Sequence, residues 1–179
     1  PGDTGYERLY SNPYASAALK TDGTLASWGY DGYGGSGAAP AGTGYTTIVP
    51  GHYAFAALNG DGTVTSWGSN VYGGTGAPVD SGYVQLIGSE RAFAALNEDG
   101  TVQSWGDGSY GGSGAPVDGG YVHLFSAGSA FVAMKADGSL SAWGNASKGG
   151  SGAPGDTGYV QVYGNTYAFV AMKADGSLT

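Results

Sequence analysis

Short apolar runs recur along the chain and are separated by polar, glycine-rich segments. Three kinds of run follow one another in a fixed order: one after a Gly-Tyr pair, as in residues 83–87, one small and aromatic, as in residues 54–58, and one ending in Trp-Gly, as in residues 63–67. In the third run Val64 and Ser66 fall on one side and Thr65 and Trp67 on the other, which is the two-residue alternation of a strand. The pattern predicts an all-β chain.

The alanine-rich second run also suits a helix, because alanine has the highest helix propensity. The run is much shorter than the ~11-residue mean helix, and turns that contain glycine bound it on both sides. Small residues on a strand are explained by close packing between successive sheets. We therefore interpret residues 54–58 and their repeats as strands.

Asp-Gly pairs separate the second run from the third, which is a strong short-range signal for a β-hairpin. Both residues tolerate positive φ, so we expect two-residue turns. The pairs are Asp22-Gly23, Asp61-Gly62, Asp99-Gly100, Asp137-Gly138 and Asp175-Gly176.

The tryptophans reveal a tandem repeat, and repeats decide the architecture of a chain. Trp28, Trp67, Trp105 and Trp143 follow one another at spacings of 39, 38 and 38 residues. The units run over residues 1–39, 40–77, 78–115 and 116–153, with a partial unit at 154–179. Because the last unit stops inside an expected strand, we expect a window on a longer array, or completion by a neighbouring copy.

Composition narrows the classes of partner. The chain has a formal net charge of −8 with only six Lys and Arg residues, which argues against a nucleic-acid or anionic-membrane surface. It has no cysteine, so disulfides and zinc–thiolate sites are excluded, and no apolar run is long enough for membrane insertion. Its 37 glycines predict many turns.

Segments 56–68 (AALNGDGTVTSWG) and 94–106 (AALNEDGTVQSWG) carry a recognisable motif: Ala-Leu, Asp-Gly, an apolar residue, two further residues, Trp-Gly, and then a glycine cluster. This motif resembles the RCC1-type repeat over essentially the whole chain. The period is closest to that of the bacterial relatives typified by the propeller-type β-lactamase inhibitory protein. The resemblance implies a β-propeller with blades of about 38 residues. Such blades form a closed ring or, as the length here suggests, an open or partial array that a neighbouring copy completes.

No catalytic, cofactor or metal site is expected. The Asp-Gly turns lack the spaced oxygen ligands of a calcium loop, and the Gly-Gly-Ser/Thr-Gly clusters lack the lysine and helix of a phosphate cradle. His52 and His123 are isolated, and His123 is expected to be an exposed strand residue. Every Asp and Ser with a fixed place in the repeat recurs, whereas an active site occurs once.

Two loops of each unit vary in sequence, one after the Trp-Gly pair and one before the alanine-rich run, while the strand sequences stay nearly constant. Binding residues are expected in the variable loops of a repeat scaffold. Tyrosine and arginine are enriched at interfaces, so these residues are candidate partner contacts, or alternatively caps on the neighbouring blade. The candidates are Tyr33, Tyr72, Tyr110, Tyr14, Tyr53 and Arg91. Asn145 begins the chain's N-glycosylation sequon.

Three functional classes follow. Near-identical units favour a non-enzymatic, extracellular structural or filament-forming protein that associates with itself. The alternative is a propeller that binds another protein, like an inhibitor or adhesin, or a glycan. An enzyme is not expected, since no unique polar residues stand out. The low charge and absence of cysteine favour an extracellular or cell-surface location.

Overall fold

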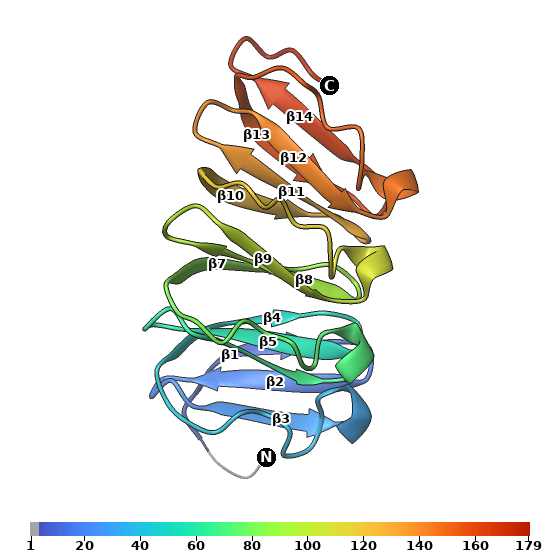
Figure 1. The fold of residues 1–179 in the computed structure, drawn as a ribbon. Helices are drawn as coiled ribbons and strands as arrows, with labels where there is room; N and C mark the ends of the chain where they lie inside the picture. Colours follow the sequence, from blue (N-terminus) through green and yellow to red (C-terminus); the bar gives the residue numbers. More distant parts are fainter. Residues whose placement is uncertain (1–3) are drawn as a thin grey trace.

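The computed structural model describes residues 4–179 as a stack of five small antiparallel sheets (Figure 1). The start of the first unit, residues 1–3, lies outside the described residues. The strands are β1 (Tyr6–Ser11), β2 (Ala15–Lys20), β3 (Leu25–Gly29), β4 (Tyr45–Pro50), β5 (Ala54–Asn59), β6 (Val64–Gly68), β7 (Tyr83–Gly88), β8 (Ala92–Asn97), β9 (Val102–Gly106), β10 (Tyr121–Ser126), β11 (Ala130–Lys135), β12 (Leu140–Gly144), β13 (Tyr159–Gly164) and β14 (Phe169–Lys173). Four 3-10 helices follow the third strands: η1 (Asp31–Tyr33), η2 (Asn70–Tyr72), η3 (Gly108–Tyr110) and η4 (Ala146–Lys148).

Each sheet corresponds to one repeat. The first four contain three strands in sequence order, and the fifth contains β13 and β14, with an added bridge between Met172 and Leu178. The first strands of consecutive sheets lie beside one another. The first and fifth sheets lie at opposite ends of the stack, so the described residues form an open array (Figure 1). Completion by a neighbouring copy stays a prediction.

The alanine-rich runs are strands, as predicted, and both of their faces are buried. In β5, Ala54 and Ala56 pack against the following sheet, whereas Phe55 and Ala57 pack against the preceding one. All four side chains are buried. A sheet covered on both sides has no solvent face, which explains why this strand lacks the polar alternation of an ordinary antiparallel strand.

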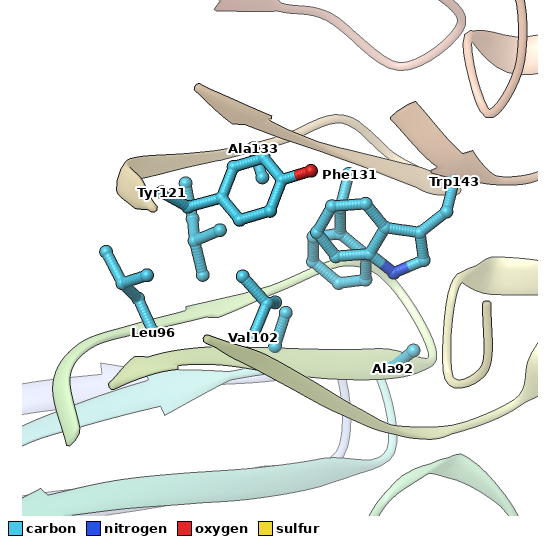
Figure 2. Packing of buried hydrophobic residues seen from close by; sticks show 9 residues of the cluster. Ala92, Leu96, Val102, Tyr121, Phe131, Ala133 and Trp143 are labelled. Carbon is cyan, nitrogen blue, oxygen red and sulfur yellow. The ribbon is translucent and has the colours of Figure 1, made fainter. Parts of the chain in front are cut away.

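Each interface between sheets pairs small side chains with large ones. Figure 2 shows Ala92, Leu96 and Val102 of the third sheet facing Tyr121, Phe131, Ala133 and Trp143 of the fourth. The Phe131 and Trp143 rings stack with their centroids 5.4 Å apart. The small residues let the sheets approach closely enough for these rings to be buried. Trp67, Trp105 and Trp143 are therefore core residues, as expected, whereas Trp28 in the first sheet is only half-buried.

The tryptophans also bind consecutive sheets through hydrogen bonds. Trp67 Nε1 donates to the Gly34 carbonyl (3.2 Å), and Trp105 Nε1 donates to the Gly73 carbonyl (3.1 Å). Gly73 has a φ of +93°, and a Cβ there would lie 2.7 Å from the Phe93 ring. The glycine clusters are thus structural, because each leaves room for the aromatic residues of the next sheet.

The Asp-Gly hairpins are confirmed, but their predicted turn type is wrong. Gly60, Asp61 and Gly62 form a three-residue loop, in which Gly62 N donates to the Asn59 carbonyl and Asn59 N to the Thr63 carbonyl. Within residues 4–179, positive φ occurs only at glycines, so the aspartates keep ordinary backbone geometry. The loop is a type I turn followed by a left-handed glycine, which is the usual three-residue hairpin connection.

Candidate functional site

The variable loops lie together at one end of the strands. The second strand of each sheet runs back from the first and the third returns, so the loop before the second strand and the 3-10 helix after the third strand share one face. The four helices project on the same side of the stack (Figure 1). We call this end the loop face and the end with the Asp-Gly hairpins the turn face. The variable loops after the Trp-Gly pairs contain the 3-10 helices η1 to η4.

All six predicted contact residues meet on the loop face. They form one continuous row that crosses three sheets, and each member contacts the next. Centroid distances are 4.8 Å for Tyr14–Tyr33, 5.0 Å for Tyr33–Tyr53 and 4.7 Å for Tyr53–Tyr72. The Arg91 guanidinium carbon lies 5.2 Å from the Tyr72 centroid and 4.6 Å from that of Tyr110. We call Tyr14, Tyr33, Tyr53, Tyr72, Arg91 and Tyr110 the aromatic row.

Backbone hydrogen bonds fix the row within each unit. Ser69 N, just before η2, donates to the Tyr53 carbonyl at 2.9 Å, and Asp107 N, just before η3, donates to the Arg91 carbonyl at 2.9 Å. Each helix then ends at a glycine with left-handed geometry, such as Gly73. The tyrosine at the helix end is therefore held beside the residue that immediately precedes the second strand.

Arg91 is the cation of the row and is held by aromatic rings. Its guanidinium also lies 5.7 Å from the Tyr53 centroid, so three rings surround it. Its Nε is buried and has no hydrogen-bond partner among residues 4–179. Cation–π attraction replaces ordinary hydrogen bonding as the force that orients this side chain.

Sequence reasoning missed three further residues of the loop face: Tyr30 beside the row, and Lys148 and Tyr167 beyond its end. Tyr30 packs 5.0 Å from Tyr33 and is 62% exposed. Further along the stack, the Lys148 ammonium lies 5.2 Å from the Tyr167 centroid. Their repeat positions could have revealed the last two, since Lys148 aligns with Tyr110 and Tyr167 with Arg91. Ser129, which also aligns with Arg91, is buried and interrupts the row.

The tyrosines fit both interpretations of their role. Tyr33 caps the next blade, because it contacts Tyr53 of the following unit. Exposed surface nevertheless remains, since Tyr14 is 48% exposed and Tyr33, Tyr53 and Tyr72 are half-buried. A residue that packs on one side and faces solvent on the other is rigid and still available for contact.

A shallow hollow of about 480 Å³ borders the row on the loop face. Its walls come from the loops between first and second strands of four sheets, including Asn12, His52, Glu90 and Gly128. The loops are joined through their backbones, because His52 N donates to the Glu90 carbonyl (2.7 Å) and Glu90 N to the Gly128 carbonyl (3.0 Å). This ladder gives the hollow a firm wall without using its side chains.

The turn face carries mainly acidic side chains, and ion pairs and hydrogen bonds to carboxylates take the place of the ring contacts of the loop face. Lys135 Nζ donates to Asp118 at 2.6 Å, and the Tyr121 hydroxyl donates to the same carboxylate at 2.9 Å. The hydrogen bond from Lys135, followed by that from Tyr121, holds the pKa of Asp118 below its usual range. Desolvation, followed by the nearby Asp80, raises the pKa of Tyr83 above its usual value.

Asp118 gives a testable dependence of stability on pH. Because its pKa is lowered in the folded state, its carboxylate stabilises the fold above the unfolded-state pKa of about 3.9, and this contribution is lost as the pH falls through the folded-state value. We expect Asp118→Asn to melt below wild type at neutral pH and the difference to shrink below about pH 4. Thermal melts from neutral pH downward measure it, and a difference that stays constant with pH would contradict it.

Asn145 and His123, which the sequence also singled out, have defined positions in the structure. The Asn145 Oδ1 accepts a hydrogen bond from Ser147 N at 3.0 Å, and its glycosylation stays a prediction. His123 is an exposed residue of β10, as expected. Across residues 4–179, no three His, Asp or Glu side chains form a group that could hold a metal ion. In the same residues no helix is long and apolar enough to cross a membrane.

Comparison with solved structures identifies the class of protein. Stacked three-stranded sheets with their first strands side by side are the blades of a β-propeller. The chain is similar to the ectodomain of the Physcomitrella patens receptor kinase CR4, with a TM-score of 0.70 and 19% identity over 98% of this chain and 51% of that chain. It is also similar to Prp20p from Saccharomyces cerevisiae, with a TM-score of 0.65 and 16% identity over 95% of this chain and 55% of that one. A third match is yeast RCC1 (Prp20) bound to Kap60, with a TM-score of 0.62 and 18% identity over 95% of this chain and 54% of that one.

These similarities establish the fold as that of RCC1-like propeller blades, in agreement with the motif in the sequence. The chain spans about half the length of each of these three structures. A scan against protein-family models gives no match, and neither does a search of curated proteins.

Proposed function

We propose that this chain is a protein-binding propeller module and that the aromatic row is its contact surface. The observation that carries the proposal is the convergence of six residues, contributed by the variable loops of three repeats, into one row on the loop face. Variation within a fixed frame is expected where a repeat scaffold meets its partner. Tyrosine and arginine are the residue types that most often dominate binding energy at protein interfaces.

Rigidity also supports the proposal. The rings contact one another across the sheets, and the helices that hold them are bound to the strands through backbone hydrogen bonds. Binding therefore costs little side-chain entropy, which is a main expense of forming an interface. Proteins with the same fold also bind proteins: Prp20p is described with its binding to Gsp1p and histones, and in complex with Kap60.

Of the two roles that the sequence suggested, the binding module is the better supported. Self-association into filaments rested on the near-identity of the units, whereas the binding role rests on residue contacts that the structure describes on the loop face. The extracellular or cell-surface location stays a prediction. It is compatible with the fold, because the CR4 match is a receptor ectodomain.

A peptide-display selection tests the proposal without a known partner. A random peptide library is selected against the wild-type chain, and the enriched peptides are measured by fluorescence anisotropy. We expect Tyr53→Ser/Tyr72→Ser to weaken their binding by at least about tenfold, because it removes the centre of the row. Circular dichroism verifies that the variant is folded.

Tyr163→Ser is the matched control. Tyr163 is 59% exposed but lies on β13, outside the row, so its replacement should leave the affinity unchanged. Failure to enrich any peptide, or equal binding by both variants, would remove the row from the function.

A further inference from the structure

Charge is distributed unequally between the two ends of the strands. The turn face holds most of the acidic side chains, and the loop face holds few. The turn-face acids are Asp22, Asp61, Asp80, Glu98, Asp99, Asp118, Asp137, Asp156 and Asp175, whereas the loop face has Asp31, Glu90 and Asp107. An anionic partner is therefore repelled by the turn face and meets less repulsion at the loop face.

The two cations of the loop face are not neutralised by the protein. The ion pairs of residues 4–179 join Arg8 to Glu7, Lys135 to Asp118 and Lys173 to Asp156. None of them includes Arg91 or Lys148, although the chain carries a net charge of −8. Both cations instead lie over tyrosine rings, Arg91 within the row and Lys148 over Tyr167.

We propose that the loop face recognises an acidic polypeptide segment, whose carboxylates bind Arg91 and Lys148 while its remaining atoms pack on the tyrosines. This inference rests on the proposed function and specifies the chemistry of the partner. Arg91 suits a carboxylate because a guanidinium is planar and can donate two parallel hydrogen bonds to the two oxygens. Three tyrosine rings lie within 4.6–5.7 Å of its guanidinium carbon and hold the side chain in place before binding.

The surroundings favour a polypeptide over an anionic glycan. Arg91 lies beside rings that pack against one another, such as Tyr53 and Tyr72 at 4.7 Å. Aromatic anchors combined with arginine are typical of the energetic centre of a protein interface. Charge complementarity then sets the specificity and the rate of association.

The experiment measures binding of a fluorescein-labelled oligoglutamate peptide to the whole chain by anisotropy, with oligoserine as the neutral control. We expect Arg91→Gln/Lys148→Gln to weaken oligoglutamate binding by at least about tenfold at low salt. Raising the salt from about 50 mM to about 200 mM should weaken binding to the wild type. Arg91→Lys, which keeps the charge but loses the planar fork, should show an intermediate affinity.

Lys135→Gln/Lys173→Gln is the matched control, because it makes the same change in net charge on the turn face. Equal weakening by both double variants would show a general charge effect and overturn the inference, as would absence of oligoglutamate binding. Arg91-dependent binding of a heparin oligosaccharide without oligoglutamate binding would overturn it in favour of a sulfated glycan. If display-selected peptides bind the row but oligoglutamate does not, the inference fails while the binding function stands.

Discussion

Trp67→Ala is expected to lower the free energy of unfolding by about 3–5 kcal/mol. The side chain is 5% exposed, stacks on Phe55 at 5.3 Å and donates through Nε1 to the Gly34 carbonyl. Its removal leaves a cavity between the first and second sheets and a buried carbonyl without its donor. Urea unfolding followed by circular dichroism measures the loss.

Trp28→Ala is the matched comparison, because Trp28 has the same place in the first unit. Trp28 is only half-buried, and its ring meets Tyr6 at a centroid distance of 6.4 Å. The loss should therefore be clearly smaller than for Trp67→Ala. Equal losses would contradict the assignment of the tryptophan to packing between sheets.

Gly62→Val is expected to destabilise the fold by about 2 kcal/mol or more, because two costs coincide. Gly62 has a φ of +81°, which a β-branched residue adopts only under strain. A Cβ at this position would also lie 2.6 Å from the backbone nitrogen of Gly82, the residue before β7 of the next sheet. Thermal and urea unfolding both measure the effect.

Gly60→Ala separates these costs from a general effect of substitution in the hairpin. Gly60 lies in the same loop, has ordinary φ, and a Cβ there would meet Thr46 at 3.5 Å, an ordinary contact. We expect little loss of stability from this variant. If it destabilised the fold as much as Gly62→Val, the close approach between sheets would not be the cause.

The repeat made most of the local structure predictable. Fixed spacing between the tryptophans and Asp-Gly pairs located every strand to within a residue or two, because two-residue alternation and hairpin signals are short-range properties. The same spacing showed that Tyr14, Tyr53 and Arg91 have equivalent places. It did not distinguish a two-residue turn from a three-residue turn, because Asp-Gly pairs fit both kinds of hairpin connection.

The sequence by itself determined the repeat, the strands, the positions of the core tryptophans and the two variable loops of each unit. Only the tertiary structure decided that Tyr33 of one unit contacts Tyr53 of the next, that three rings surround Arg91, and that Lys148 extends the pattern. The physical reason is that period and turn chemistry act along the chain, whereas these contacts depend on the angle and spacing at which consecutive sheets stack. That stacking is set by the fit of the large rings into the small-residue faces of the preceding sheets.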